Sequence, residues 1–224
     1  MGGSGVKVYI GEPTGKMVSY VKKKGWGAVI TPFQFRNPYP FKFNFYFVDN
    51  GVYSLYLKGA EFDGELFIST LERVRKVFFP QLPDFVVLPD KVAAGEESLE
   101  LSLHWHEKLK ELFPEFRYAL VVQDGMKIQS VEEAIRETKV EFLFVGGTTE
   151  WKLRTGRTWV ELARSFGIRC HVGRVGTKRR VKWAKLVEAD SIDSALPLFS
   201  KKKLKTFERG LYEPVQIPLF REVV

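Results

Sequence analysis

Short apolar runs, each ending in polar or glycine residues, recur along the chain and alternate with amphipathic segments. Runs that are almost continuously apolar and separated by helical patterns are typical of parallel strands covered on both faces. Eight such runs predict an α/β fold, an irregular (β/α)8 barrel of the TIM type, with a doubly wound open sheet as the alternative. The runs occupy residues 6–11, 27–32, 43–51, 85–90, 118–125, 142–147, 168–176 and 190–194.

The domain organisation follows from length and from the segments between the runs. With 224 residues, 45% of them hydrophobic, the chain has room for one substantial core. We expect residues 1–200 to form the barrel and residues 201–224 to form a basic C-terminal helix and tail packing on or beside it. Amphipathic patterns predict barrel helices over 101–113, 130–139, 158–167 and 178–188.

Two local details refine these expectations. Ser130 and Glu133 have the spacing of a capping box, which predicts that the helix over 130–139 begins at Ser130. The link over residues 33–42, between the second and third runs, lacks room for a helix. The barrel is therefore expected to be irregular at that point.

The composition limits the compartment and the partners. Lysine and arginine outnumber aspartate and glutamate by 35 to 27, and the excess is clustered, which favours a nucleic-acid partner over a merely solvated surface. The single cysteine, Cys170, excludes an internal disulfide and a thiolate zinc site and predicts a reducing compartment, the cytoplasm (that of the host if the protein is viral). No run is long enough to span a membrane. The first residues, MGGSG, resemble a cloning remnant more than a signal peptide.

Polar and glycine residues follow the apolar runs at the points where the strands are expected to end. In a barrel of this kind, the carboxyl ends of the strands form the active face, so these residues are expected to converge. Each is ordinary alone, since Asp-Asn-Gly is common turn chemistry and an Asp after Pro can cap a helix. The six strand ends expected to converge are Asp49-Asn50-Gly51, Pro89-Asp90, Gln123-Asp124-Gly125, Gly146-Gly147, Arg174-Val175-Gly176 and Asp193-Ser194.

In order and spacing, these motifs resemble the guanine transglycosylases of the queuine and archaeosine type, which exchange guanine for a 7-deazaguanine base. VDNGVYS (48–54) is similar to the family's TDSGGFQ, and VVQDG (121–125) to its IVQGG. LPD (88–90) lies where the family has a purine-reading aspartate, and VGGTTE (145–150) corresponds to GGLAVGE. Residues 174–197 are similar to VGTPEDILEAVARGVDMFDCVLP. The resemblance covers about residues 48–197.

The resemblance implies roles for the three aspartates. Asp193 would be the nucleophile and Asp49 the general acid and base, while Asp190 matches a preceding aspartate without a catalytic role. Exchange would proceed by a retaining double displacement, without metal or cofactor. Asn50 replaces a serine of the family pattern.

The family's zinc subdomain is absent from this sequence. The chain therefore looks more like the small phage-type enzymes that place 7-deazaguanines in DNA. DNA is the expected substrate, tRNA is the alternative, and the incoming base would be a preQ0-like 7-deazaguanine. A homodimer is common in the family.

The hydrogen-bonding edge of guanine suits the remaining polar residues. Its N1–H and 2-amino donors suit the carboxylate of Asp90, and its O6 acceptor suits the amide of Gln123 and the backbone N–H of Gly147. Adenine has the opposite polarity at this edge and would leave a buried Asp90 unpaired. Tyr53 or Phe33 is a candidate to stack on the base.

Clustered cations after the strand ends are expected to hold the phosphates that flank a flipped nucleotide. They are Lys152, Arg154, Arg157, Arg174, Lys178, Arg179 and Arg180.

Two other functions stay open at this point. The first is a catalytically silent nucleic-acid-binding barrel that serves as the partner subunit of an active enzyme, which the presence of both Asp49 and Asp193 argues against. The second is a hydrolase that removes a base or cleaves a small nucleoside, which would leave the cations unexplained.

Three other patterns carry no site. GEPTGKM (11–17) has one residue too few between its glycines for a phosphate loop. His104 and His106 point to different faces of a helix. His171, beside Cys170, is expected to pack inside a strand.

Overall fold

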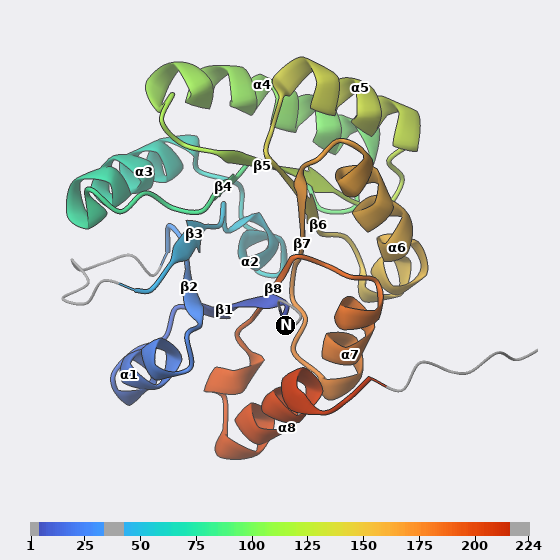
Figure 1. Ribbon diagram of the computed structural model, residues 1–224. Coiled ribbons are helices and arrows are strands. Elements are labelled where there is room, and N and C mark those ends of the chain that lie inside the picture. The colour runs from blue at the N-terminus through green and yellow to red at the C-terminus, as the bar shows by residue number, and fades with distance from the viewer. Residues whose placement is uncertain (1–4, 34–42, 216–224) are drawn as a thin grey trace, which may run out of the picture.

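The computed structural model describes residues 5–33 and 43–215, which form a closed barrel of eight parallel strands (Figure 1). The strands follow one another around the barrel in chain order. The predicted TIM-type barrel is therefore confirmed. The strands are β1 (Lys7–Gly11), β2 (Gly27–Ile30), β3 (Tyr46–Val48), β4 (Val86–Val87), β5 (Tyr118–Val122), β6 (Phe142–Val145), β7 (Arg169–Val172) and β8 (Ser191–Ser194).

The pairing of β1 with β8 closes the barrel. The strands run parallel with Tyr9 opposite Asp193 and Ile10 opposite Ser194. An open sheet would leave these two strands as edges, so the alternative topology is wrong. Since all pairs are parallel, all eight carboxyl ends lie at the same end of the barrel.

Side chains alternate between the barrel interior and the layer under the helices. Cys170 faces the outer layer, whereas its neighbour His171 contacts the rings of the interior. The interior is unusually aromatic, and it fills the barrel below its carboxyl end. It contains Tyr9, Val29, Phe47, Phe85, Val87, Ala119, Val121, Phe142 and Phe144.

The helices surround the barrel as an outer ring, and α2 is the exception, lying inside that ring in Figure 1. The helices are α1 (Lys16–Lys23), α2 (Val52–Tyr56), α3 (Gly64–Phe78), α4 (Glu96–Leu112), α5 (Ile128–Thr138), α6 (Thr149–Ser165), α7 (Lys178–Leu186) and α8 (Lys201–Tyr212), with a 3-10 turn, η1 (Leu196–Leu198), before α8. Side-chain caps begin four of them, supplied by Asp63, Thr148, Thr177 and Ser200.

The predicted helices all exist, and the helix over 178–188 begins at Lys178 as predicted, but the other three starts differ. The helices over 101–113 and 158–167 begin earlier, at Glu96 and Thr149. The capping box at Ser130 is wrong, because α5 begins at Ile128 and the backbone N–H just before it is bonded by a side chain of another helix. The Glu96 carboxylate of α4 accepts a hydrogen bond of 2.8 Å from the backbone N–H of Lys127. Helices α1, α2 and α3 are absent from the predicted elements.

The barrel is irregular, with two-residue β4 as its shortest strand. The expectation that residues 33–42 have no room for a helix falls, except for Phe33, outside the described residues. Of the described helices, none is both long and apolar enough to cross a membrane.

Helix α8 packs beside α7 and against the N-terminal part of the chain. Phe207 is fully buried, and its ring meets Trp26 edge-on with centroids 5.7 Å apart. Glu208 accepts a hydrogen bond of 2.6 Å from the Tyr20 hydroxyl and pairs with Lys24 at 2.6 Å. The basic segment after residue 200 thus packs on the barrel as far as α8 extends, while residues 216–224 lie outside the described part.

We therefore expect Phe207→Ala to lower the free energy of unfolding by about 3–5 kcal/mol, because it removes a buried ring and leaves a cavity. Urea denaturation followed by circular dichroism measures this change. Lys202→Ala, at an exposed position of the same helix, is the matched control and should change stability by less than about 0.5 kcal/mol. Equal stabilities of the two variants would mean that α8 does not pack on the barrel.

Candidate active site

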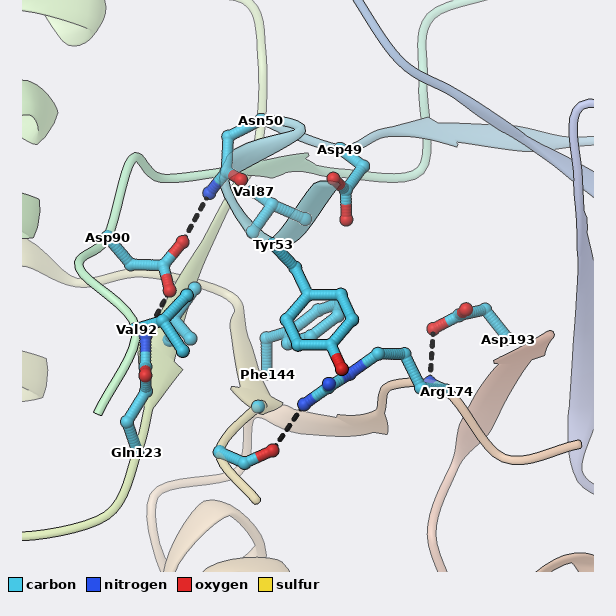
Figure 2. A pocket seen from close by; sticks show the side chains of 13 residues that line it. Asp49, Asn50, Tyr53, Val87, Asp90, Val92, Gln123, Phe144, Arg174 and Asp193 are labelled. Carbon is cyan, nitrogen blue, oxygen red and sulfur yellow. Dashed lines mark hydrogen bonds between the residues drawn. The ribbon is translucent and has the colours of Figure 1, made fainter. Parts of the chain in front are cut away.

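A small cavity of about 70 Å³, open to solvent, lies at the carboxyl end of the barrel (Figure 2). This volume is smaller than that of typical small-molecule sites. Every one of the six predicted strand ends contributes to its lining, although residues such as Asp124, Gly176 and Ser194 do not line it. The complete lining is Asp49, Asn50, Tyr53, Val87, Asp90, Val92, Val121, Gln123, Phe144, Gly146, Gly147, Arg174 and Asp193.

Asp49 follows β3 and begins the turn into α2. Its Oδ1 accepts a hydrogen bond of 2.7 Å from the backbone N–H of Gly51. Gly51 is required there, because its φ is +77° and a side chain would collide with the ring of Phe33. This packed turn holds the Asp49 side chain toward Asp193 (Figure 2).

Asp193 lies on β8, whose register turns its side chain into the barrel. It faces Asp49, which follows β3, across the cavity. Its Oδ1 accepts two hydrogen bonds, one of 3.0 Å from His171 Nε2 and one of 3.1 Å from the backbone N–H of Arg174. The side chain is 15% exposed, whereas that of His171 is fully buried. One oxygen is thus held by the protein, which leaves Oδ2 for bond formation.

Asp90 occupies the other side of the pocket and is held by two carboxamides. Asn50 Nδ2 donates to one oxygen at 2.7 Å, and Gln123 Nε2 donates to the other. Gln123 is itself oriented, because its Oε1 accepts a hydrogen bond of 2.7 Å from the backbone N–H of Ala93. Gln123 therefore positions Asp90. Its amide N–H group points at Asp90, not at the place expected for O6 of a base.

Burial changes the acidity of two of the carboxyl groups. Desolvation, together with the charge of Asp193, raises the pKa of Asp49 to about 6, against the lowering effect of the Gly51 N–H and Arg174. Desolvation likewise raises the pKa of Asp90 to about 7, opposed by its bond from Asn50. A carboxyl group that keeps its proton near neutral pH is suited to act as a general acid.

Arg174 brings the one guanidinium among the pocket's lining residues. Its guanidinium carbon lies 3.7 Å from the centroid of the Tyr53 ring, and Nη2 donates to the carbonyl of Gly147. The residue has a φ of +59°, a left-handed conformation that costs a side-chain-bearing residue about 1–2 kcal/mol. Its backbone bond to Asp193 offsets this cost. The side chain therefore lies in the pocket, running from beside Asp193 along the Tyr53 ring to the Gly147 carbonyl (Figure 2).

Two glycines form part of the wall. A Cβ at Gly147, where φ is +65°, would lie 2.5 Å from Asp124 Oδ2 and 2.6 Å from the Trp151 ring. Asp124 is occupied in turn by the backbone N–H and hydroxyl of Thr148, at 2.7 and 2.6 Å. Only glycine allows the chain to pass this closely, which leaves the pocket wall without a side chain at that point.

The prediction that Lys152 binds phosphate conflicts with its position. Lys152 is 5% exposed, its ammonium donates to the carbonyl of Gly173, and desolvation lowers its pKa to about 7. Lys152 is buried because helical periodicity places it, like Trp151, on the inner face of the first turn of α6. A buried ammonium cannot reach a polyanion outside.

Arg157 also lies away from the active face. It is about 12 Å along α6 from Thr149, given the rise of a helix, and its Nη2 donates at 3.3 Å to the carbonyl of Leu186 at the end of α7. Helices of the barrel run away from the active end, so Arg157 points toward the opposite end. The expected phosphate contact of Arg157 is therefore not supported, while Arg154 is exposed nearer the start of α6.

Lys178, Arg179 and Arg180 form the first turn of α7, directly after the loop that carries Arg174. Arg179 is exposed, and Lys178 pairs with Glu213 at 2.5 Å. Arg180 lies against the pocket loop, with Nη1 donating at 3.4 Å to the carbonyl of Arg174. This part of the predicted basic cluster therefore borders the site.

Asp190 and the three histidines do not line the pocket. Asp190 Oδ2 accepts a hydrogen bond of 2.7 Å from the Cys170 N–H at the opposite end of the barrel, a structural role as predicted. His104 is exposed whereas His106 is buried against Tyr118. His171 packs inside its strand as expected, but its contact with Asp193 was not anticipated. The alternation along β7, which places His171 on the side of the barrel interior, was the available signal.

Neither a known protein family nor a curated protein matches this chain. In the part of the chain that the structure describes, no three His, Cys, Asp or Glu side chains are grouped to hold a metal ion.

The raised pKa of Asp49 predicts a pH-dependent effect of Asp49→Asn on stability. Between pH 3.8, the ordinary value, and about 6, the folded protein binds more protons than the unfolded chain. The wild type therefore loses free energy of unfolding as the pH rises through this window. The amide variant, which has no charge to bury, should be more stable by about 3 kcal/mol at pH 8 and equally stable below pH 3.8.

Urea denaturation of both proteins at pH 3.5, 6 and 8 measures this difference. A difference that stays constant across the three pH values would show that burial of the Asp49 charge is not its cause.

Proposed function

We propose that the protein is a nucleic-acid guanine transglycosylase that exchanges guanine in DNA for a preQ0-like 7-deazaguanine. The observation that carries the proposal is the convergence of a protonatable Asp49 and a hydrogen-bonded Asp193 in one pocket, facing a third carboxyl group held by two amides. The order of the motifs over residues 48–197, which is similar to that of the guanine transglycosylases, supports the same reaction. Transfer RNA is the alternative substrate.

The reaction is a double displacement at C1′ of the target nucleotide. Asp193 Oδ2 attacks C1′, the bond from C1′ to N9 of guanine breaks, and Asp49 gives its proton to the departing base. The incoming base then transfers its N9 proton to Asp49, and N9 attacks C1′ and displaces Asp193. Each residue returns to its starting state, and the configuration at C1′ is retained.

Base selection depends on Asp90. Both of its oxygens accept hydrogen bonds from the protein, and each oxygen keeps a second lone pair for the N1–H and 2-amino group of guanine. Asn50 and Gln123 hold the carboxylate in the plane of the base. Adenine would bring no matching pair of donors, and each buried group left unpaired costs about 1–3 kcal/mol.

A purine enters the pocket only if Arg174 moves. The flat guanidinium lies against Tyr53, in the place that a stacked base would take. An arginine side chain rotates outward readily, and outside the pocket it would join Arg179 and Arg180 against the phosphates of the flipped nucleotide.

The cations of α7 are better suited to nucleic acid than to the stability of the helix. Its first turn carries Lys178, Arg179 and Arg180 and no acidic residue. Positive side chains at this end oppose the helix dipole, so the helix itself gains nothing from them. A polyanion beside the pocket would account for their position.

The decisive experiment is exchange of radiolabelled guanine into duplex DNA, single-stranded DNA and tRNA, measured side by side. We expect label in DNA, and we expect Asp193→Ala to lower the rate by at least about 1,000-fold, because it removes the nucleophile. Asp190→Asn is the matched control and should retain exchange, because Asp190 precedes β8 and lies at the end of the barrel opposite the pocket.

Exchange by folded Asp193→Ala would rule out Asp193 as the nucleophile. Binding of nucleic acid without exchange by the wild type would favour the silent barrel, and release of free base without exchange would favour the hydrolase.

The first displacement should also depend on pH through Asp49. Guanine release requires its protonated form, so the single-turnover rate at saturating nucleic acid should fall about tenfold per pH unit above its pKa of about 6. Rapid-quench measurement of released guanine between pH 5 and 8 gives this profile. In Asp49→Asn the release should be slow and lack this limb; an unchanged profile would remove Asp49 from the acid role.

A further inference from the structure

Behind Asp193 lies a buried histidine that none of the steps above uses. His171 is on β7 and points into the barrel, where it is 0% exposed. Its Nε2 is 3.0 Å from Asp193 Oδ1, the oxygen that also accepts the Arg174 N–H. The contact joins neighbouring strands, because His171 pairs with Ser191 in the register of β7 and β8.

The hydrogen bonds define the form of the imidazole. A carboxylate only accepts, so Nε2 must carry the proton that reaches Asp193. Nδ1 lies 2.9 Å from the Ser191 hydroxyl and, carrying no proton, accepts a hydrogen bond from that hydroxyl. Desolvation lowers the pKa of His171, and the nearby charge of Lys152 lowers it further, which outweighs the raising effect of Asp193 and keeps the ring neutral.

Aromatic packing fixes the direction of this donor. The imidazole stacks on Phe144 with centroids 4.7 Å apart, and three further rings surround it, with centroids at 5.1 Å for Phe47, 5.4 Å for Phe85 and 5.7 Å for Tyr9. Rings packed on this many sides leave the imidazole no room to rotate. The Nε2–H therefore keeps one orientation toward Asp193, and in this dry interior the bond is stronger than in water.

We propose that His171 is a positioning residue for the nucleophile, which donates through Nε2–H to Asp193 Oδ1 and thereby aims Oδ2 at C1′. This inference rests on the proposed function, since it assumes that Asp193 attacks. Oδ1 remains an acceptor both in the free carboxylate and in the glycosyl ester, where it is the carbonyl oxygen. The same hydrogen bond therefore persists through both displacements, and no proton passes through His171.

The first test compares His171→Leu with His171→Gln in the exchange assay. Leucine removes the donor at similar size, whereas the amide nitrogen of glutamine can take the place of Nε2. We expect His171→Leu to lower kcat about 100-fold with KM for nucleic acid unchanged, because misplacement of a reacting group costs about this much. His171→Gln should restore kcat to within a few-fold of the wild type.

Cys170→Ala is the matched control, because Cys170 is equally buried on the same strand but faces the outer layer. It should lower the melting temperature without changing kcat. If His171→Leu does the same, His171 only stabilises the fold, and the inference is overturned while the proposed function stands. If the wild type exchanges no base, the proposed function falls first, and the catalytic meaning of the contact falls with it.

A second measurement uses the wild-type protein and needs no activity. Nitrogen-15 NMR of the His171 ring should show a neutral imidazole protonated at Nε2 between pH 6 and 8. A ring protonated at Nδ1, or at both nitrogens, would contradict the assigned hydrogen bond whatever the variants do.

Discussion

Closure of the barrel through the pairing of β1 with β8 is the constraint on which the site depends. Tyr9 lies opposite Asp193 in this pair, so the closing contact places the last strand end beside the first. Because every strand is parallel, Asp49 and Asp193 come to the same end of the barrel although they are far apart in the sequence. A slip of one residue in β8 would turn Asp193 out of the interior and away from the pocket.

Three carboxyl groups share this pocket, and their surroundings differ in kind. Asp49 receives a single backbone N–H and is dominated by burial, which raises its pKa to about 6. Asp193 receives a backbone N–H and a buried imidazole on one oxygen, which suits the anion. Asp90 is fixed by two carboxamides that leave it directed across the cavity. Different environments for chemically identical groups are what the proposed double displacement would require.

The aromatic interior connects the fold to the site. The rings of Phe47, Phe85 and Phe144 fill the barrel under the pocket and pack around the imidazole of His171. They stabilise the closed barrel by burial, and they also exclude water from the floor of the site. One set of contacts thus supports both the fold and the orientation of a polar donor.

The barrel and the convergence of the strand ends could be predicted from the amino-acid sequence, because both follow from periodicity and from the direction of parallel strands. Helix starts were less predictable: the α5 start depends on Glu96, a side chain from another helix that no local pattern contains. The positions of the cationic and amide side chains depend on the tertiary structure and could not be predicted from local sequence. Lys152 is buried under its helix, Arg174 packs on Tyr53 inside the pocket, and the Ala93 N–H orients Gln123 toward Asp90. The tertiary structure also decided that His171 meets Asp193, since a contact across neighbouring strands depends on register, and register is set by the closing of the whole sheet.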